Sequence, residues 1–533
     1  MHAYRKSKHY VPYAPERAEA YRRAGYWIGQ THTDFLRQTH DQYGHKIAVI
    51  QNDRQLSYSE LHQKSSAYGH YLTSQGINQG DFIILQSANV MAFFIALFGI
   101  FHAGARPIFA LDGHGAYEVE NIAKASAAKG YIRILSQSGA KDDAPTIVHK
   151  FVEPQKSLTY IQTIYGHEPL ESMMTSSPNH VLDEPQKVSS EDIAFLQLSG
   201  GTTGLPKLIP RTHDDYLYSV RCSVAVSGLH SDSVQLVALP ISHNFTMSSP
   251  GVLGALSAGA TIVLAENGSP DSCFTLIEQH KVTQVSLVPS LALLWLNSAL
   301  KEDYDLSSLE VIQVGGAELL PEIAQRLIQT FNIKLQQVYG MAEGLVNFTH
   351  LSDDLHTVIH TQGKKLSPSD ERLIVNDEGE PVGHHTIGHI LTRGPYTING
   401  YYNAHDINQN AFTADGFYIT GDLGYIDEQQ NIVVTGRAKS QINRAGEKIA
   451  PSELENLLIT HPLIQNVNVV GIKDVHLGEK IKVNIILARP ESTLSLLDIR
   501  KYLMGKNVAP YKLPDVIEIM TSFQQTLIGK VKK

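Results

Sequence analysis

An apolar run from Val90 to Phe101 limits the possible folds of this chain more than any other stretch. It is too short to cross a bilayer as a helix, which takes roughly 20 residues, so it predicts a helix buried in a protein core. Strand-like apolar runs flank it at residues 81–85 and 105–109. A strand, a helix and a second strand in this order are typical of a parallel α/β sheet.

Further apolar runs repeat this pattern later in the chain. Each is short and is followed by small residues or proline, which favours a second parallel sheet; the runs lie at 234–239, 260–264, 282–288 and 311–314. Closer to the N-terminus, Ser57 or Ser59 is expected to cap a helix. Residues 137–190 are polar and contain several prolines, so we expect a long surface excursion with little core there.

The length of the chain, and a change along it in the pattern of predicted strands and turns, indicate how it divides into domains. With 533 residues the chain is too long for one hydrophobic core. Short strands with hairpin-like turns after residue 372 indicate a small barrel or an antiparallel region. We predict an α/β protein with a large N-terminal domain, residues 1–438, made of two parallel-type α/β subdomains and a small β-barrel-like region. A small mobile α+β domain, residues 439–533, is expected to follow.

Charge and cysteine content narrow the function classes. The formal net charge of −9 argues against a nucleic-acid-binding protein, which normally shows a basic face. Cys222 and Cys273 are the two cysteines; they have no metal-site spacing, which favours free thiols in a reducing cytoplasm. The first residues are basic but are not followed by the apolar segment of a signal peptide. We therefore expect a cytoplasmic protein with no nucleic-acid partner and no membrane association.

A stretch rich in glycine and hydroxyl groups follows the strand-like run at 193–198. Its residues are Ser199, Gly200, Gly201, Thr202, Thr203, Gly204, Leu205, Pro206 and Lys207. Many free backbone N–H groups, three hydroxyls and a lysine suit a polyphosphate. The stretch lacks the Gly-Lys-Ser/Thr ending of the Walker pattern. We expect a phosphate-binding loop between a strand and a segment that can turn helical, with a flexible surface loop as the alternative.

Four more clusters of glycine with polar residues stand at predicted strand ends, where α/β proteins bind ligands. The paired glycines of Gly315-Gly316-Ala317-Glu318 let a flat ring lie against the backbone. The cluster Tyr339-Gly340-Met341-Ala342-Glu343-Gly344 offers an aromatic face and a carboxylate. The last two clusters contribute an acid, Asp422, and two cations, Arg437 and Lys439.

Together these motifs resemble those of the adenylate-forming superfamily, which includes acyl- and aryl-CoA synthetases, nonribosomal adenylation domains and luciferase. The resemblance covers essentially the whole chain and keeps the order of the motifs. It implies the fold expected above, with ATP as a substrate, Mg²⁺ as a cofactor and an acyl adenylate as the product of the first step.

The resemblance also implies a role for each motif residue. Ser199 to Lys207 would cover the β- and γ-phosphates, Glu343 would bind Mg²⁺, and Asp422 would accept hydrogen bonds from the ribose hydroxyls. Arg437 would contact ribose or phosphate, and Lys439 falls at the hinge between the domains. The adenine slot and its surroundings would comprise Gly315, Gly316, Ala317, Glu318, Tyr339, Gly340 and Met341.

A lysine near the C-terminus completes the catalytic set that the resemblance implies, namely Lys530, Lys207 and Glu343. The superfamily places this lysine in a Gly-Lys pair beside the reacting carboxylate, and the pair here is Gly529-Lys530. Its context departs from the usual pattern, because Leu527-Ile528 stands where a Thr-Pro pair is commoner. On the sequence alone, a solvated lysine is the competing interpretation of both Lys530 and Lys439.

The segment that starts at His243 indicates which acid is activated. Superfamily members that activate amino acids carry an aspartate for the substrate ammonium, and Asn244 occupies the corresponding segment here. A buried aspartate that faced no amine would be an uncompensated charge, whereas an asparagine can hydrogen-bond a neutral phenol. The segment closely resembles that of the 2,3-dihydroxybenzoate-AMP ligases, which open catechol siderophore pathways.

By this match an aryl acid contacts His243, Asn244, Phe245, Ser249, Val338 and Val346. Asn244 and Ser249 would meet the ring hydroxyls, Phe245 would stack, and the two valines would form walls. The resemblance then implies transfer of the aryl group to a phosphopantetheinylated aryl carrier protein supplied in trans. Three alternatives stay open: a salicylate-AMP ligase, an aryl-CoA ligase and an inactive nucleotide-binding protein.

Overall fold

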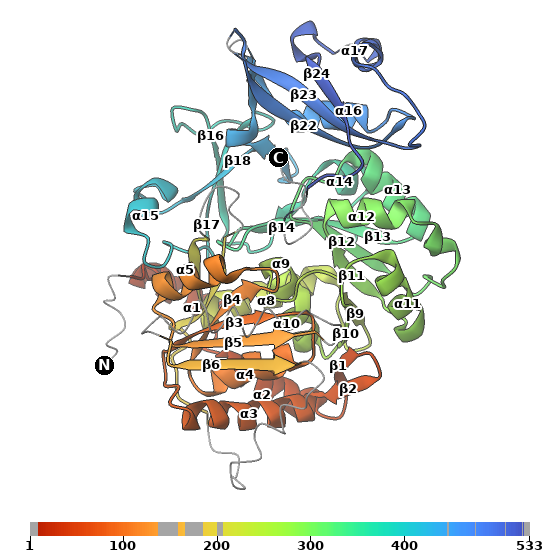
Figure 1. Cartoon of the computed structure of the whole chain (residues 1–533). Coiled ribbons are helices and arrows are strands. Elements are labelled where there is room, and N and C mark those ends of the chain that lie inside the picture. Colours follow the sequence, from red (N-terminus) through yellow and green to blue (C-terminus); the bar gives the residue numbers. More distant parts are fainter. Residues whose placement is uncertain are drawn as a thin grey trace.

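The computed structural model describes residues 9–136, 158–165, 185–199, 206–444, 447–474, 476–506, 508–524 and 526. Figure 1 shows the C-terminal unit, which contains β22, β23, β24, α16 and α17, at the opposite end of the molecule from strands β1 to β6. The helices are α1 (Pro15–Arg23), α2 (His32–Tyr43), α3 (Tyr58–Ser74), α4 (Ala92–His102), α5 (Ala116–Ser126), α8 (His213–Ser227), α9 (Asn244–Ser248), α10 (Gly251–Ala258), α11 (Pro270–His280), α12 (Pro289–Asn297), α13 (Pro321–Phe331), α14 (Leu355–His360), α15 (His405–Ala411), α16 (Pro451–Leu458) and α17 (Leu496–Gly505). Short 3₁₀ turns are η3 (Ala299–Glu302), η4 (Ala438–Ser440) and η5 (Pro510–Lys512).

The first sheet has the strand order β6-β5-β3-β4-β7-β8 and is parallel except for its last pair. Its strands are β3 (Phe82–Ser87), β4 (Arg106–Leu111), β5 (Gly130–Leu135), β6 (Tyr160–Tyr165), β7 (Ile193–Leu198) and β8 (Leu208–Thr212). Every residue of α4, which connects β3 to β4, is buried. The apolar run at 90–101 is therefore the crossover helix of a parallel pair, as the sequence predicts.

The second sheet has the order β15-β14-β13-β12-β11-β9-β10-β1-β2, with a parallel centre and antiparallel edges. Its strands are β1 (Ile47–Gln51), β2 (Arg54–Ser57), β9 (Val234–Val237), β10 (Thr261–Leu264), β11 (Gln284–Leu287), β12 (Val311–Gly315), β13 (Lys334–Gly340), β14 (Val346–Phe348) and β15 (Lys364–Lys365). β1 pairs in parallel with β10, so the N-terminal segment completes the sheet of the second subdomain.

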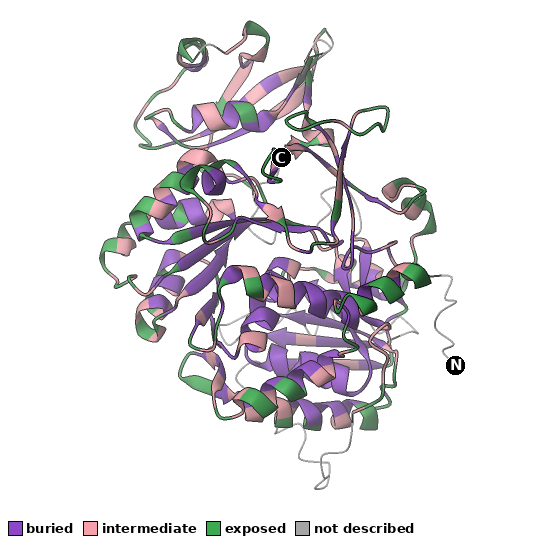
Figure 2. Ribbon diagram, turned by 180° about the vertical axis from the view of Figure 1, so that it is seen from behind, coloured by how far each residue is buried: buried purple, intermediate pink, exposed green. Residues whose placement is uncertain are grey.

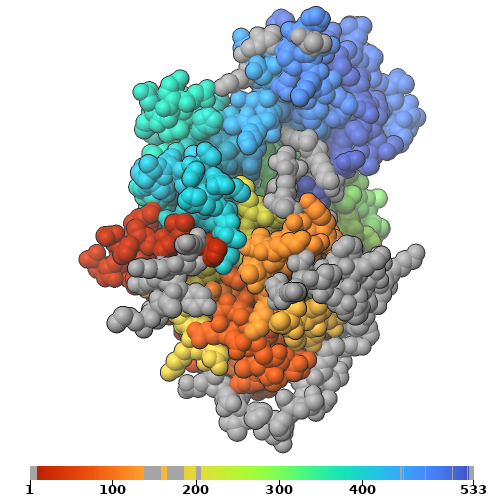
Figure 3. Space-filling model, turned by 60° about the vertical axis from the view of Figure 1, so that its left-hand side comes forward, coloured from red at the N-terminus to blue at the C-terminus, as the bar shows by residue number. Residues whose placement is uncertain are grey.

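Two smaller sheets follow. Four antiparallel strands in the order β16-β17-β18-β19 form the antiparallel region expected after residue 372; they are β16 (Glu371–Val375), β17 (Gly388–Arg393), β18 (Tyr418–Ile426) and β19 (Ile432–Arg437). The C-terminal sheet contains β20 (Ile442–Arg444), β21 (Glu447–Ile449), β22 (Ile464–Asp474), β23 (Gly478–Leu487) and β24 (Val516–Ile519). Figure 3 shows the C-terminal unit, in blue, adjoining the cyan antiparallel region.

Buried residues are concentrated in the two parallel sheets, and exposed residues lie on the outer helices and loops (Figure 2). Figure 2 shows purple, buried strands inside both parallel sheets and green, exposed residues on the outer helices and loops. One apolar cluster connects the two subdomains. It contains Phe94 and Phe98 of α4, which belongs to the first sheet, together with Val252 and Leu256 of α10, which lies between β9 and β10 of the second. In the described part of the chain, no helix is both long enough and apolar enough to span a bilayer.

Two local expectations need correction. The stretch at 199–207 does not lead directly into a helix, since residues 208–212 form strand β8, which pairs antiparallel with β7, and α8 begins only at His213. The expected surface excursion at 137–190 also contains a strand, because β6 adds to the first sheet beside β5. Buried Tyr160 and Ile164 supply the apolar character that the polar composition of the region conceals. Residues 137–157 and 166–184 lie outside the described residues.

Candidate functional site

The carboxyl end of β12 meets the end of β13 at a place with no room for a side chain. A Cβ atom on Gly315 would lie 2.7 Å from the backbone oxygen of Val338 and 3.0 Å from Cζ of Phe245. Gly316 follows with φ +84°, a conformation that favours glycine. The glycines expected to form the adenine slot therefore bring the backbone of β12 against the ring of Phe245.

An acid, a tyrosine and an arginine lie together beside this edge. The Tyr339 hydroxyl donates to Oδ2 of Asp422 at 2.7 Å, and Nε of Arg437 lies 2.6 Å from Oδ1. Asp422 and Arg437 are directly opposite each other in the pairing of β18 with β19. Burial, followed by the charge of Asp422, raises the pKa of Tyr339 well above its usual value, so the phenol keeps its proton and can donate. These three predicted nucleotide residues form one cluster.

The ends of the glycine-rich stretch are fastened to each other. The Ser199 N–H donates to the Lys207 carbonyl at 3.0 Å, and the Lys207 N–H donates to Oγ of Ser199 at 2.9 Å. These bonds extend the pairing of β7 with β8 by one step. The intervening predicted phosphate contacts, Gly200, Gly201, Thr202, Thr203 and Gly204, lie outside the described residues, as does Lys530.

Glu343 lies in the turn between β13 and β14 and is almost fully buried. Its Oε1 accepts a hydrogen bond of 2.8 Å from the Tyr401 hydroxyl. The turn is closed by a bond from the Met341 N–H to the Leu345 carbonyl. Gly344 has φ +140°, and a Cβ there would lie 2.3 Å from the backbone oxygen of Tyr396, so no larger residue fits without a shift of the backbone.

A buried arginine that sequence reasoning missed holds this turn. Arg211, at the end of β8, pairs with Asp215 at 2.8 Å, and both side chains are almost completely buried. Its remaining nitrogens donate to the carbonyls of Ala342 at 3.0 Å and Tyr396 at 3.1 Å. A charged residue inside an otherwise apolar strand run was the available signal, because buried arginines are rare unless paired. Arg211 thereby joins β8 to the residue before Glu343.

The apolar residues predicted to meet an aryl ring pack in one cluster. Phe245, Val338 and Val346 are buried there together with Tyr218, Leu239, Val288, Phe348 and Tyr396. This cluster lies directly beside the Gly315 slot, since Phe245 and Val338 belong to both. A flat apolar group bound here would therefore adjoin the residues predicted to bind the nucleotide.

Three polar residues border the apolar cluster. Asn244 begins α9, and its side-chain oxygen accepts a 2.9 Å hydrogen bond from the hydroxyl of Tyr216. His243 caps the same helix through Nδ1, which accepts from the Phe245 N–H at 3.2 Å. Ser249 follows the helix and is buried. Tyr216 is a second contact that sequence reasoning missed, because nothing in the spacing of residues 216 and 244 indicates that they meet.

The remaining predicted residues lie toward the C-terminal unit. Glu318 accepts a 3.4 Å hydrogen bond from the side chain of Asn456 in α16, and Ser452 of α16 donates to the Thr435 carbonyl at 3.1 Å. Lys439 is exposed and lies in η4, between the last strand of the antiparallel sheet and β20. Gly340 ends β13, and Met341 packs against the cluster around Tyr401.

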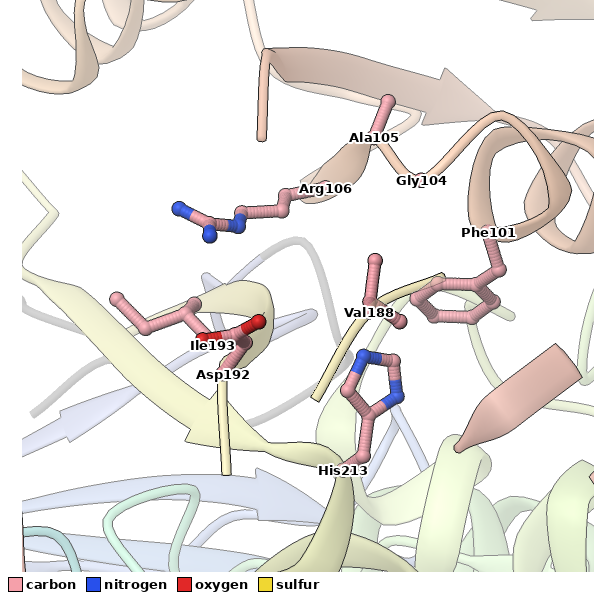
Figure 4. Close-up of a pocket in the computed structure, with 8 residues that line it drawn as sticks. All are labelled: Phe101, Gly104, Ala105, Arg106, Val188, Asp192, Ile193 and His213. Carbon is pink, nitrogen blue, oxygen red and sulfur yellow. The ribbon is translucent and has the colours of Figure 1, made fainter. Parts of the chain in front are cut away.

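A small pocket lies at the opposite edge of the first sheet, where β4 and β7 begin. Figure 4 shows Arg106, Asp192 and His213 around it, together with Phe101 and Val188. His213 begins α8, and its Nδ1 lies 2.7 Å from Nδ1 of the buried His32. The pocket shares no lining residue with the predicted nucleotide or aryl residues.

Comparison with known proteins places the chain in a family. The model of the AMP-binding enzyme family matches residues 36–402, and that of the AMP-binding enzyme C-terminal domain matches residues 453–530. The chain belongs to the AMP-binding enzyme family. The family resemblance predicted from the motifs is thereby confirmed, and so is the α/β fold with a large first and a small last domain.

Several full-length relatives of this AMP-binding enzyme are named for aryl acids. It is 43% identical to the 2,3-dihydroxybenzoate-AMP ligase of Bacillus subtilis, over 99% of this chain and 96% of that one. It is 42% identical to the salicyl-AMP ligase / salicyl-S-ArCP synthetase of Mycobacterium tuberculosis, covering 98% of this chain and 93% of that one. Among solved structures, apo MbtA of Mycobacterium smegmatis matches with a TM-score of 0.75 and 36% identity, over 98% of this chain and 97% of the other.

Proposed function

We propose that this AMP-binding enzyme activates 2,3-dihydroxybenzoate with ATP and passes the aryl group to a carrier protein. In the first step a carboxylate oxygen attacks the α-phosphorus, the bond to the bridging oxygen breaks, and pyrophosphate leaves with aryl-AMP as product. In the second step a phosphopantetheine thiolate attacks the acyl carbon and AMP leaves. The carrier is a separate aryl carrier protein of a siderophore pathway.

One observation carries the choice of acid: Asn244 borders the apolar cluster of Phe245, Val338 and Val346 beside the nucleotide residues. An amide in this position offers hydrogen bonds to a phenol but no charge to an ammonium group. The named activities of the aryl-acid relatives support the same choice. Relatives named for salicylate are almost as similar, and the buried hydroxyl of Ser249 favours the acid that has a second ring hydroxyl.

The nucleotide residues support the first step by position and charge. In the proposal, Asp422 accepts from the ribose hydroxyls, with Arg437 beside the ribose or the phosphates. Gly315, Gly316 and Ala317 with Tyr339 form the adenine slot. Lys207 and the glycine-rich stretch neutralise the leaving pyrophosphate, and Lys530 is proposed to meet the reacting carboxylate. Preorganised charge of this kind supplies most of the rate enhancement in phosphoryl-type transfers.

A single carboxylate, that of Glu343, is a suitable protein ligand for a magnesium ion that arrives bound to the nucleotide. In the described part of the chain, no group of three or more His, Cys, Asp or Glu residues forms a metal cage. Mg²⁺ commonly binds through one or two carboxylates together with substrate phosphates and water. Glu343 is one such carboxylate. The ion would neutralise charge on the phosphates, while Glu343 holds it in place.

We also propose that the domains are residues 1–438 and 439–533, with Lys439 at the hinge between them. The position of Lys439 in the short turn η4 supports this, because a few loop residues can absorb the change in φ and ψ of a domain rotation. A Lys439→Pro variant should keep aryl-AMP formation and lose thioester formation, since proline fixes φ. Equal losses in both half-reactions would contradict the hinge.

Pyrophosphate exchange tests the proposed substrate. We expect ATP–pyrophosphate exchange that depends on 2,3-dihydroxybenzoate, with weaker exchange on salicylate and none on amino acids. An Asn244→Asp variant should lose at least a hundredfold in kcat/KM, because the uncompensated carboxylate costs about 3–5 kcal/mol. Exchange driven best by an amino acid would refute the proposal, and thioester formation on CoA but not on a holo carrier protein would make it an aryl-CoA ligase.

A further inference from the structure

The hydroxyl of Tyr401 joins three separate motifs of the site. It donates to Oε1 of Glu343 at 2.8 Å and lies 3.0 Å from the hydroxyl of Tyr418. Nζ of Lys207 approaches it at 3.5 Å and lies 4.5 Å from the centre of its ring. These partners come from the end of the glycine-rich stretch, the turn after β13 and the start of β18, so one atom connects segments that are far apart in sequence.

The protons in this cluster can be assigned from the chemistry of the groups. An ionised carboxylate only accepts hydrogen bonds, so Tyr401 uses its single proton on Glu343. Tyr418 must then donate to Tyr401, and the ammonium group of Lys207 is also a donor. The phenolic oxygen has two lone pairs, which match these two donors. The hydroxyl of Tyr401 thus has all its hydrogen-bonding positions filled: it accepts from Lys207 and Tyr418 and donates to Glu343.

Tyr401 itself is held rigidly. Its side chain is almost completely buried. Its N–H donates to Oδ1 of Asn408 at 2.8 Å, and Nδ2 of Asn408 donates back to its carbonyl at 3.0 Å. The ring packs against Ile209, Phe412 and Tyr418. A residue fixed at both its backbone and its ring can hold the side chain of Glu343 in one orientation.

We propose that Tyr401 is a positioning residue that fixes Glu343 for a divalent cation bound with ATP and keeps Lys207 from pairing with it. The inference rests on the proposed function, in which Glu343 holds Mg²⁺ and Lys207 meets phosphate. Tyr401 occupies only Oε1 of Glu343 through the bond described above. Without this hydroxyl, Oε1 of Glu343 loses the donor that Tyr401 supplies, and Lys207 can approach the carboxylate directly. An ion pair between them would compete with both the cation and the phosphates.

Binding of Mn²⁺ in place of Mg²⁺ tests the proposal without any aryl acid. Electron paramagnetic resonance measures free Mn²⁺ in the presence of a non-hydrolysable ATP analogue. We expect Tyr401→Phe to weaken Mn²⁺ binding about tenfold, the lower end of the effect of losing one hydrogen bond to a charged group. The Mg²⁺ concentration for half-maximal pyrophosphate exchange should rise by a similar factor, with less than a twofold change in the KM of the aryl acid.

A matched control is Tyr131→Phe, which removes another buried hydroxyl, bonded at 2.6 Å to Gln86 in the first sheet. It should leave Mn²⁺ binding unchanged. If Tyr401→Phe does not fold, Tyr418→Phe removes one donor to Tyr401 and should weaken Mn²⁺ binding about twofold to threefold. In a Glu343→Gln background, Tyr401→Phe should cause no further loss, because Tyr401 acts through Glu343.

Two results would overturn the inference. One is unchanged Mn²⁺ affinity in Tyr401→Phe, or in Tyr418→Phe where only that variant folds. The other is a full additional loss in the Glu343→Gln background. Absence of exchange on every aryl acid by the unmodified enzyme would instead refute the proposed function, while Mn²⁺ binding with the ATP analogue still reports on Tyr401.

Discussion

The hydroxyl of Tyr216 donates a hydrogen bond of 2.9 Å to the side-chain oxygen of Asn244. Tyr216 is fully buried, and burial raises its pKa to about 12, so it keeps its proton at neutral pH. This bond fixes which way the amide of Asn244 faces, and its two N–H groups are the donors that it can offer to a substrate. A ring hydroxyl would then accept a hydrogen bond from Asn244.

Tyr216→Phe tests this orientation. The amide can then turn over, so its donors no longer point consistently toward the acid, and the KM of the aryl acid should rise about tenfold. The KM of ATP should change less than twofold. Pyrophosphate exchange at varied acid and ATP concentrations gives both values. An equal rise in the two KM values would show that Tyr216 supports the whole site rather than Asn244.

Gly315→Ala probes the slot between β12 and β13. Its Cβ would lie 2.7 Å from a backbone oxygen of β13, closer than real Cβ contacts allow, so the strands must separate or the ring of Phe245 must move. We expect AMP binding, measured by calorimetry, to weaken at least tenfold. Gly383→Ala is the control, because its Cβ meets no atom within 4 Å and its backbone is unstrained. Unchanged AMP affinity in Gly315→Ala would exclude the slot.

Arg211→Ala should destabilise the large domain strongly. It leaves Asp215 buried without its partner, which costs about 3–5 kcal/mol, and it releases two backbone carbonyls. The control is Lys124→Ala, which breaks a more exposed pair with Glu120, also four residues away in the sequence, and should cost less than about 1 kcal/mol. Urea unfolding compares the two. Similar losses for both variants would contradict the role given to Arg211.

The buried pair of His32 and His213 predicts a loss of stability in acid. Burial lowers the pKa of His213 to about 3 and holds that of His32 well below its usual value. Both rings therefore stay neutral in the folded protein, and the unfolded chain binds protons more readily below about pH 6.5. The stabilisation is complete above that pH and is lost as the pH falls toward 3, by up to about 1.4 kcal/mol per unit for each histidine.

His213→Gln should flatten this pH dependence, since one of the two protonation sites is removed. Unfolding free energies between pH 7 and pH 4 measure the slope. His405→Gln, a change at an exposed histidine of α15, should leave the slope as it is in the unmodified protein. A slope that is unaltered in His213→Gln would show that acid sensitivity arises elsewhere.

Local sequence signals predicted much of the fold because they act within a few residues. Ser57 caps α3, with Glu60 completing the capping box, as one of the two serines expected there. Pro451 begins α16, and the helix ends just before the His461-Pro462 pair. The glycine clusters stand at strand ends, as predicted, except the one at residues 418–424, which lies inside β18, where Asp422 pairs with Arg437 of β19. The prediction failed at β6 and β8 because these short strands, although their residues favour a strand, lie beside polar or glycine-rich segments that conceal them.

By itself, the sequence determined the parallel α/β class, the order of the motifs and the residue types that suit a nucleotide and an acid without an amino group. Only the tertiary structure decided that Tyr401 meets Glu343 and Lys207, that Arg211 reaches the carbonyl of Ala342, and that Tyr216 orients Asn244. The physical reason is the distance along the chain between the interacting residues. Helix caps and turns depend on neighbours along the chain, whereas these contacts join segments up to 194 residues apart, and their partners are selected by how the sheets pack.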